Sequence, residues 1–121
     1  MDHICLVLPV LAGKTDDARA FMRELEEVRK AEFDASERRI GISKELWYLA
    51  KLPTGDQLVG YIESKDFGAA VAQFSASQDG FDLWFKARMH QATGVDLNHL
   101  PEGFAPPELL SHYDVGQMQR A

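Results

Sequence analysis

Side chains suited to acid/base chemistry gather near residue 60. Glu63 follows Tyr61 by two positions, so both should point to one face of a β-strand. Among aromatic side chains, desolvation would raise the pKa of the Glu63 carboxyl and make it a candidate general base. The hydroxyl groups of Tyr61 and Tyr48 could orient a ligand beside it. The alternative for Glu63 is a solvated or arginine-paired residue at a strand end.

Two tryptophans and a histidine are further candidate ligand contacts. Trp47 and Trp84 could line a pocket for a flat molecule, although aromatic residues at strand and helix spacing also form ordinary core. His90 ends an aromatic helical stripe, and a partly exposed helix position is its alternative. The predicted catalytic residue is therefore Glu63, and the predicted ligand-binding residues are Tyr48, Tyr61, Trp47, Trp84 and His90.

The residue spacing argues against metal and phosphate chemistry. Cys5 stands alone, and the four histidines have no i, i+4 pair; they are His3, His90, His99 and His112. Gly13-Lys14-Thr15 resembles the end of a phosphate-binding loop, but the first glycine of that motif would be at position 8, which is Leu8. We expect no metal and no cofactor.

Composition bounds the class of protein. The chain has 121 residues, 45% of them hydrophobic, and a net charge of −6. A chain of this length is expected to form one domain over residues 1–121. We expect neither nucleic-acid nor membrane partners, because the chain is acidic and the basic pair Arg38-Arg39 has no other basic residues clustered beside it. The apolar run 4–12 follows Asp2 and no Lys or Arg, which favours a strand over a signal peptide. With one cysteine, we expect a cytoplasmic protein.

Periodicity places the candidate residues on secondary structure. A strand is predicted over His3–Leu8. A helix, straight or bent, is predicted from Thr15 to about Arg39, ending at Gly41. A hairpin follows, with strands 46–52 and 57–63 around Pro53-Thr54-Gly55-Asp56. Pairing Leu52 with Gln57 would place Tyr48 opposite Tyr61 and Leu46 opposite Glu63. Trp47, Leu49, Leu58 and Ile62 would then share the other face.

The second half of the chain predicts two helices and a last strand. Asp66 and Asp79 are candidate caps of helices, and Asp82, three residues after Asp79, resembles the second residue of a capping box with Asp in place of Glu. This last helix is predicted to run to about Thr93 and to end at Gly94. Leu109 to Val115 could form an edge strand, and residues 116–121 a frayed tail. The order predicts an α+β fold, the ferredoxin-like β-α-β-β-α-β antiparallel sheet with helices on one face. Because the strands are apolar on both faces, we expect a homodimer through the open sheet face.

Several segments resemble a group of small uncharacterised bacterial proteins. The matching segments are Pro9, Gly13–Thr15, Ala18–Phe21, Ala31–Ile42, Glu45-x-Trp47, Tyr61–Glu63, Phe81-Asp82-x-Trp84-Phe85 and Gly94–Leu97. That group is similar to the dimeric α+β barrel superfamily, which includes cofactor-free monooxygenases, haem-degrading enzymes, stress-response proteins and small isomerases. The resemblance implies this fold and leaves the chemistry open.

Two functions remain open at this stage. The first is a cofactor-free enzyme, monooxygenase- or isomerase-like, that acts on a small apolar or aromatic molecule. The second is a non-catalytic module for small-molecule binding or dimerisation. An open lumen holding Glu63 with a raised pKa would favour the enzyme.

Overall fold

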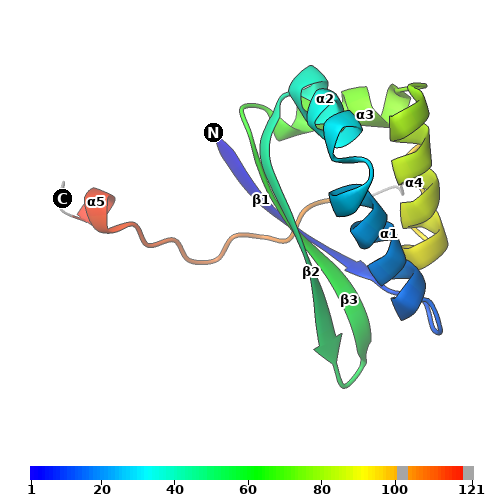
Figure 1. Cartoon of the computed structure of the whole chain (residues 1–121). Helices are drawn as coiled ribbons and strands as arrows, with labels where there is room; N and C mark the ends of the chain where they lie inside the picture. The colour runs from blue at the N-terminus through cyan, green and yellow to red at the C-terminus, as the bar shows by residue number, and fades with distance from the viewer. Residues whose placement is uncertain (101–103, 119–121) are drawn as a thin grey trace.

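The computed structural model describes residues 1–100 and 104–118. One layer is an antiparallel sheet, and the other is formed by helices that lie on one side of it (Figure 1). The elements in chain order are β1 (Asp2–Pro9), α1 (Thr15–Glu27), α2 (Lys30–Ile40), β2 (Ile42–Leu52), β3 (Gly55–Ser64), α3 (Phe67–Ala76), α4 (Gly80–Thr93) and α5 (Val115–Met118).

The sheet has three strands in the order β1-β3-β2. Leu52 pairs with Gly55, which leaves Pro53-Thr54 as a two-residue turn. The predicted pairing was wrong by two residues: Tyr48 lies opposite Val59, and Leu46 lies opposite Tyr61. Gly55, at φ 136°, enters the strand instead of the turn because it can adopt backbone angles that other residues avoid. A shift of two residues keeps every side chain on its predicted face.

The first predicted helix is two helices. α1 ends at Glu27, and α2 begins after Arg29, whose side chain binds Glu24 with a 2.8 Å hydrogen bond from Nε to Oε2. Gly41 ends α2 in the left-handed conformation, at φ 86°, as predicted. Asp66 caps α3 by accepting a hydrogen bond from the Ala69 amide, also as predicted. The break between α1 and α2 lets α2 lie across β2 and α4.

The core lies between the sheet and the helices. Strand residues that face the helices alternate with outward residues, as the predicted faces required: Leu8 pairs with Leu58, and Ile4 pairs with Ile62. The buried cluster consists of Leu8, Ala18, Phe21, Leu25, Leu58, Phe81, Phe85, Met89 and Ala92. The outer face of the sheet is apolar but uncovered; Leu46 is 44% exposed and Tyr48 is 59% exposed.

The predicted fourth strand is wrong. Residues 109–114 form no strand, and Val115 begins the short helix α5. Pro106 and Pro107 lack amide donors, and the segment leaves the sheet, so the free edge of β1 is not paired by it (Figure 1). The predicted frayed tail is helical over 116–118, and 119–121 lie outside the described residues. No helix in the described ranges is long and apolar enough to cross a bilayer.

Candidate functional site

The predicted site residues lie on different surfaces of the domain. Glu63, Tyr61 and Tyr48 are on the outer face of the sheet, because they alternate with the inward residues of β3 and β2. Trp47 points inward, toward the helices, and lines a cavity there. The structure therefore brings Glu63 together with Tyr61 but separates both from the tryptophans.

Glu63 is ionised more easily than predicted. The Tyr61 hydroxyl donates a 2.7 Å hydrogen bond to Glu63 Oε2. This bond lowers the pKa of Glu63 despite partial desolvation, and the positive charge of Lys44 adds to the effect. The raised pKa expected for a Glu63 enclosed in a lumen is not found in the single chain, because this face of the sheet is open there. The role of Glu63 as a general base stays a prediction.

Trp84 and His90 lie away from the cavity. Trp84 packs edge-to-face on Phe21, with ring centroids 5.4 Å apart, and the Arg29 guanidinium carbon lies 4.4 Å from its ring centroid. It therefore belongs to the contact between α1 and α4. His90 is exposed near the end of α4, and its carbonyl oxygen accepts a hydrogen bond from the Gly94 amide. A ligand role for either residue stays a prediction.

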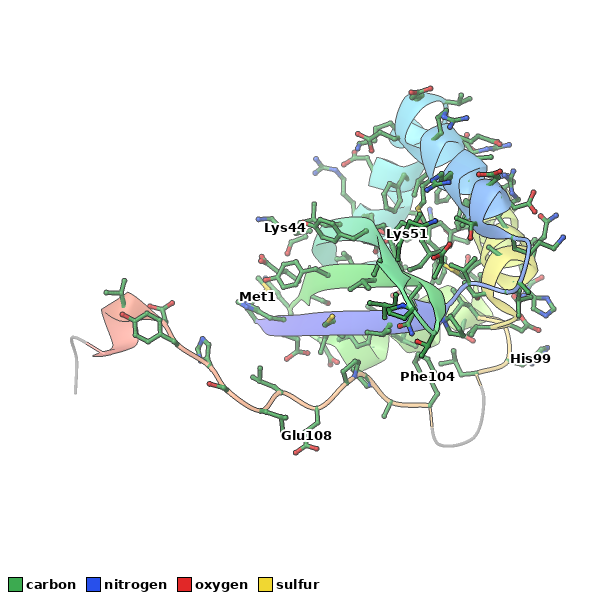
Figure 2. All side chains as sticks on the ribbon, turned by 90° about the horizontal axis from the view of Figure 1, so that it is seen from below. Met1, Lys44, Lys51, His99, Phe104 and Glu108 are labelled. Atoms are coloured by element: carbon green, nitrogen blue, oxygen red, sulfur yellow. The ribbon has the colours of Figure 1, made fainter. Side chains whose placement is uncertain are left out.

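A cavity of about 70 Å³ lies between the sheet and α2, α3 and α4. Its walls are almost entirely apolar and rich in aromatic rings, namely Phe33, Phe67, Phe74, Phe81, Phe85, Phe104 and Trp47. Phe104, at the start of the C-terminal segment, packs against the core, whereas Glu108 lies farther along this segment (Figure 2). The polar residues that line the cavity are Ser36, Glu37 and Glu45. An apolar cavity with a few convergent polar groups is the usual form of a ligand site.

Glu37 and Glu45 form a pair of carboxyl groups in this cavity. Glu37 comes from α2 and Glu45 from β2, and the two groups lie within hydrogen-bond reach of each other. The Trp47 indole Nε1 donates a 2.8 Å hydrogen bond to Glu45 Oε2. Glu37 Oε2 is buried and accepts no hydrogen bond from the described residues. Such a pair requires a proton, because two adjacent buried carboxylates repel each other.

The surroundings of the pair favour its protonated form. Burial raises the pKa of Glu37 to about 10, and the negative charges of Glu45 and Asp82 act in the same direction. Burial also raises the pKa of Glu45, although hydrogen bonds from Trp47 and Glu37 oppose this shift. The pair therefore retains at least one proton at neutral pH and titrates as a unit. Perturbed carboxyl groups in a cavity are a recognised mark of functional sites.

Gly60 fixes the position of the Trp47 indole. It lies opposite Trp47 on β3, and a Cβ atom at Gly60 would come within 2.8 Å of Trp47 Cη2 and Cζ3. Only glycine therefore lets the indole ring lie across β3. The space above Gly60 therefore keeps the Trp47 indole in place, with its Nε1 beside Glu45.

A buried polar network supports α2 next to Glu37. Asp82 is fully buried and accepts hydrogen bonds from Ser36, Ser77 and Arg39. Burial opposes the ionisation of Asp82, but these three hydrogen bonds outweigh it and lower its pKa. The predicted capping-box role of Asp82 was wrong, since its carboxylate points into this network. The network joins α2 to α4 and keeps a negative charge behind Ser36.

Sequence reasoning missed Glu37 and Glu45. The alternation of β2 carried a signal, because Glu45, Trp47 and Leu49 share the inward face. Glu37 likewise shares a helix face with Phe33 and Ile40, four residues before and three residues after it. In each case, a glutamate among apolar residues on one face of the element could have predicted a buried carboxyl group.

Metal ligation has no visible basis in the described residues. Within 1–100 and 104–118, no three His, Cys, Asp or Glu side chains group so that they could hold a metal ion. The expectation of chemistry without a metal or cofactor stays a prediction.

A solved structure resembles this architecture. Tetracenomycin F2 cyclase from Streptomyces glaucescens, a type-II polyketide cyclase, aligns with 95% of this chain and 99% of its own, at 14% identity and a TM-score of 0.56. The two chains share a fold. This likeness agrees with the resemblance to the dimeric α+β barrel superfamily and does not extend to the chemistry. No protein-family model and no curated protein matches the sequence.

Proposed function

We propose that this protein is a cofactor-free acid/base catalyst that acts on a small apolar or aromatic molecule. The Glu37–Glu45 pair carries the proposal, because it places a held proton and a proton acceptor in an apolar cavity. Isomerisation and ring closure at a carbonyl compound both need this combination. The fold shared with a polyketide cyclase is compatible with ring closure.

In this mechanism, the two neighbouring carboxyl groups act on adjacent atoms of one carbonyl compound. Glu37 gives its proton to the carbonyl oxygen, while the Glu45 carboxylate removes a proton from the adjacent carbon. The product is an enol, and the proton now on Glu45 returns to Glu37 through their mutual contact. The Trp47 indole holds Glu45 in place during the transfer. The apolar walls exclude water from the reacting atoms.

Deuterium exchange into an enolisable aromatic ketone tests the proposal. With phenylacetone, a single-ring ketone, in D₂O, we expect the wild type to accelerate exchange at the carbon next to the carbonyl. Glu45→Gln should reduce this acceleration by about 10²-fold or more, since general base catalysis contributes on that order. NMR spectroscopy measures the rate.

Two further variants interpret the exchange assay. Glu27→Gln, at an exposed position of α1, should match the wild type. If Glu63→Gln loses the activity and Glu45→Gln keeps it, then the outer face is the catalytic one. If the wild type gives no acceleration over buffer, the proposed enolisation is contradicted.

The outer face of the sheet supports a second proposal, a homodimer through this face. Val7, Leu46 and Tyr48 are exposed there, and a contiguous apolar sheet surface of this kind is normally covered. A second copy would cover it symmetrically. The dimer would also enclose Glu63 and Tyr61, which returns them to the lumen expected from the sequence. A cytoplasmic location remains part of this proposal.

Light scattering at micromolar concentration tests the dimer. We expect a mass of about 27 kDa, twice the 13.6 kDa of one chain. Leu46→Glu should convert the protein to a 13.6 kDa species, because a charge would be buried in the interface. Leu83→Glu, at an exposed apolar position of α4, should leave the dimer intact. A wild-type protein of 13.6 kDa would exclude this interface.

A further inference from the structure

We infer that the cavity binds its ligand through a neutral oxygen, a phenol hydroxyl or a carbonyl, and rejects carboxylates and phosphates. This inference rests on the proposed function, because it takes the Glu37–Glu45 cavity as the ligand site. It adds the chemical class of the ligand.

One carboxyl group in the cavity receives no hydrogen bond from an N–H or hydroxyl donor. Glu37 Oε2 is buried and accepts none from such groups of the described residues, and Glu37 has the Glu45 carboxyl as its neighbour. The other polar groups of the cavity have such partners: the Ser36 hydroxyl donates to Asp82, and Glu45 accepts from the Trp47 indole. A ligand hydroxyl or carbonyl would add a hydrogen bond that the pair does not make by itself. A protonated carboxyl can donate to a carbonyl or accept from a phenol hydroxyl.

No cation is available to an anionic ligand. None of the described residues that line the cavity is Lys, Arg or His. On α4, the Lys86 ammonium is held by three backbone carbonyl oxygens, and on α2, the Arg39 guanidinium binds Asp82 and Asp79. A carboxylate in the cavity would lie beside two carboxyl groups, with the Asp82 charge behind Ser36. Like charges in a poorly solvated site repel strongly.

A cationic ligand meets a different obstacle. An ammonium group would lose its hydration in an apolar cavity, where the Glu45 carboxylate already accepts a hydrogen bond from the Trp47 indole and has the Glu37 carboxyl as its neighbour. The single carboxylate therefore replaces only part of the water that a cation loses. A neutral oxygen requires no change of charge in the cavity, which makes it the favoured group.

The size of the cavity fits single-ring ligands. Its volume of about 70 Å³ is smaller than the roughly 150 Å³ of a cavity that encloses benzene completely. A ring would therefore enter with its oxygen toward Glu37 and extend toward Phe104 and Leu97, which also line the cavity. Phenyl-sized probes with different charges are suited to this site.

Calorimetry with three matched probes tests the inference. The probes are p-cresol, 4-methylbenzoate and 4-methylbenzylammonium, which share a tolyl ring and differ in charge. At pH 7 we expect p-cresol to bind at least about 10-fold more tightly than either ion, as one hydrogen bond or one charge mismatch is worth about that ratio. The inference is overturned if the benzoate or the ammonium binds as well as p-cresol, or if none of the three binds.

Variants at Glu37 connect the selectivity to this residue. Glu37→Gln keeps a neutral hydrogen-bonding group and should bind p-cresol within about 3-fold of the wild type, whereas Glu37→Leu should lose about 10-fold. If Glu37→Leu does not fold, the comparison of Glu37→Gln with the wild type carries this test. Equal binding by Glu37→Leu and the wild type would overturn the assignment of Glu37.

The outcome is distinguishable from failure of the proposed function. Selective binding of p-cresol without deuterium exchange would leave the inference standing and contradict catalysis. Exchange that depends on Glu45, together with tight binding of the benzoate, would contradict the inference alone.

Discussion

Glu37→Gln should remove most of the pH dependence of stability between pH 5 and pH 9. In the wild type, burial raises the pKa of Glu37 from 4.5 to about 10, and the Glu45 charge adds to this. Between these two values the folded protein holds a proton that the unfolded chain has released. The free energy of unfolding therefore falls as pH rises, by at most about 1.4 kcal/mol per pH unit. Glutamine cannot titrate, so only the part of the slope that comes from the raised pKa of Glu45 should remain.

The sign of this effect identifies its source. The stabilisation from a neutral Glu37 is complete below pH 4.5 and is lost as pH rises toward about 10. Carboxyl groups whose pKa is lowered, such as those of Asp82 and Asp56, behave in the opposite way and stay ionised from pH 5 upward. They do not mask the slope. Across four pH units the wild type should lose at most about 5 kcal/mol.

Urea unfolding at pH 5, 7 and 9, followed by circular dichroism, measures this difference. Glu27→Gln is the matched control, because the same substitution at an exposed position of α1 should keep the wild-type slope. Parallel stability curves for the wild type and Glu37→Gln would show that Glu37 is ionised in the folded protein. The proposed proton donor would then be absent.

Lys86→Met should cost about 3–5 kcal/mol of stability, the range for breaking a buried charged network. Lys86 is 0% exposed. Its ammonium donates to the carbonyl oxygens of Phe74, Ser75 and Ser77, at 2.9, 3.1 and 2.9 Å. These carbonyl groups belong to the end of α3 and the turn after it, and the Phe74 oxygen also accepts a hydrogen bond from the Ser77 amide. Methionine fills similar space but removes the charged donor from all three and leaves Phe74 with the Ser77 amide.

Thermal and urea unfolding of Lys86→Met at pH 7 give this value. Lys65→Met serves as the control, because Lys65 is exposed and surface substitutions usually change stability by less than about 0.5 kcal/mol. A loss below about 1 kcal/mol for Lys86→Met would mean that water replaces the ammonium at the end of α3. The Lys86 ammonium would then not be needed to hold α4 against the end of α3.

Local sequence patterns were sufficient to predict which strand residues face the helices and where two of the helices end. Alternation on the strands placed Leu58 and Ile62 inward and Tyr61 and Glu63 outward, and this held although the hairpin register was wrong by two residues. The helix ends at Gly41 and Gly94 followed from glycine, which adopts positive φ readily. Strand faces and helix ends depend on residues only a few positions apart in the chain, so they can be predicted from the sequence.

The candidate site depended on contacts across the chain. Glu37 and Glu45 are eight residues apart, but they meet only because the turn at Gly41 folds β2 back along α2. Asp82 looked like part of a capping box, and its burial depends on Ser36 and Arg39, more than forty residues away. A carboxyl pKa follows from solvation and neighbouring charges in three dimensions. Alternation could place Glu45 on the inner face, but only the packing of α2 on the sheet decided that it shares a proton.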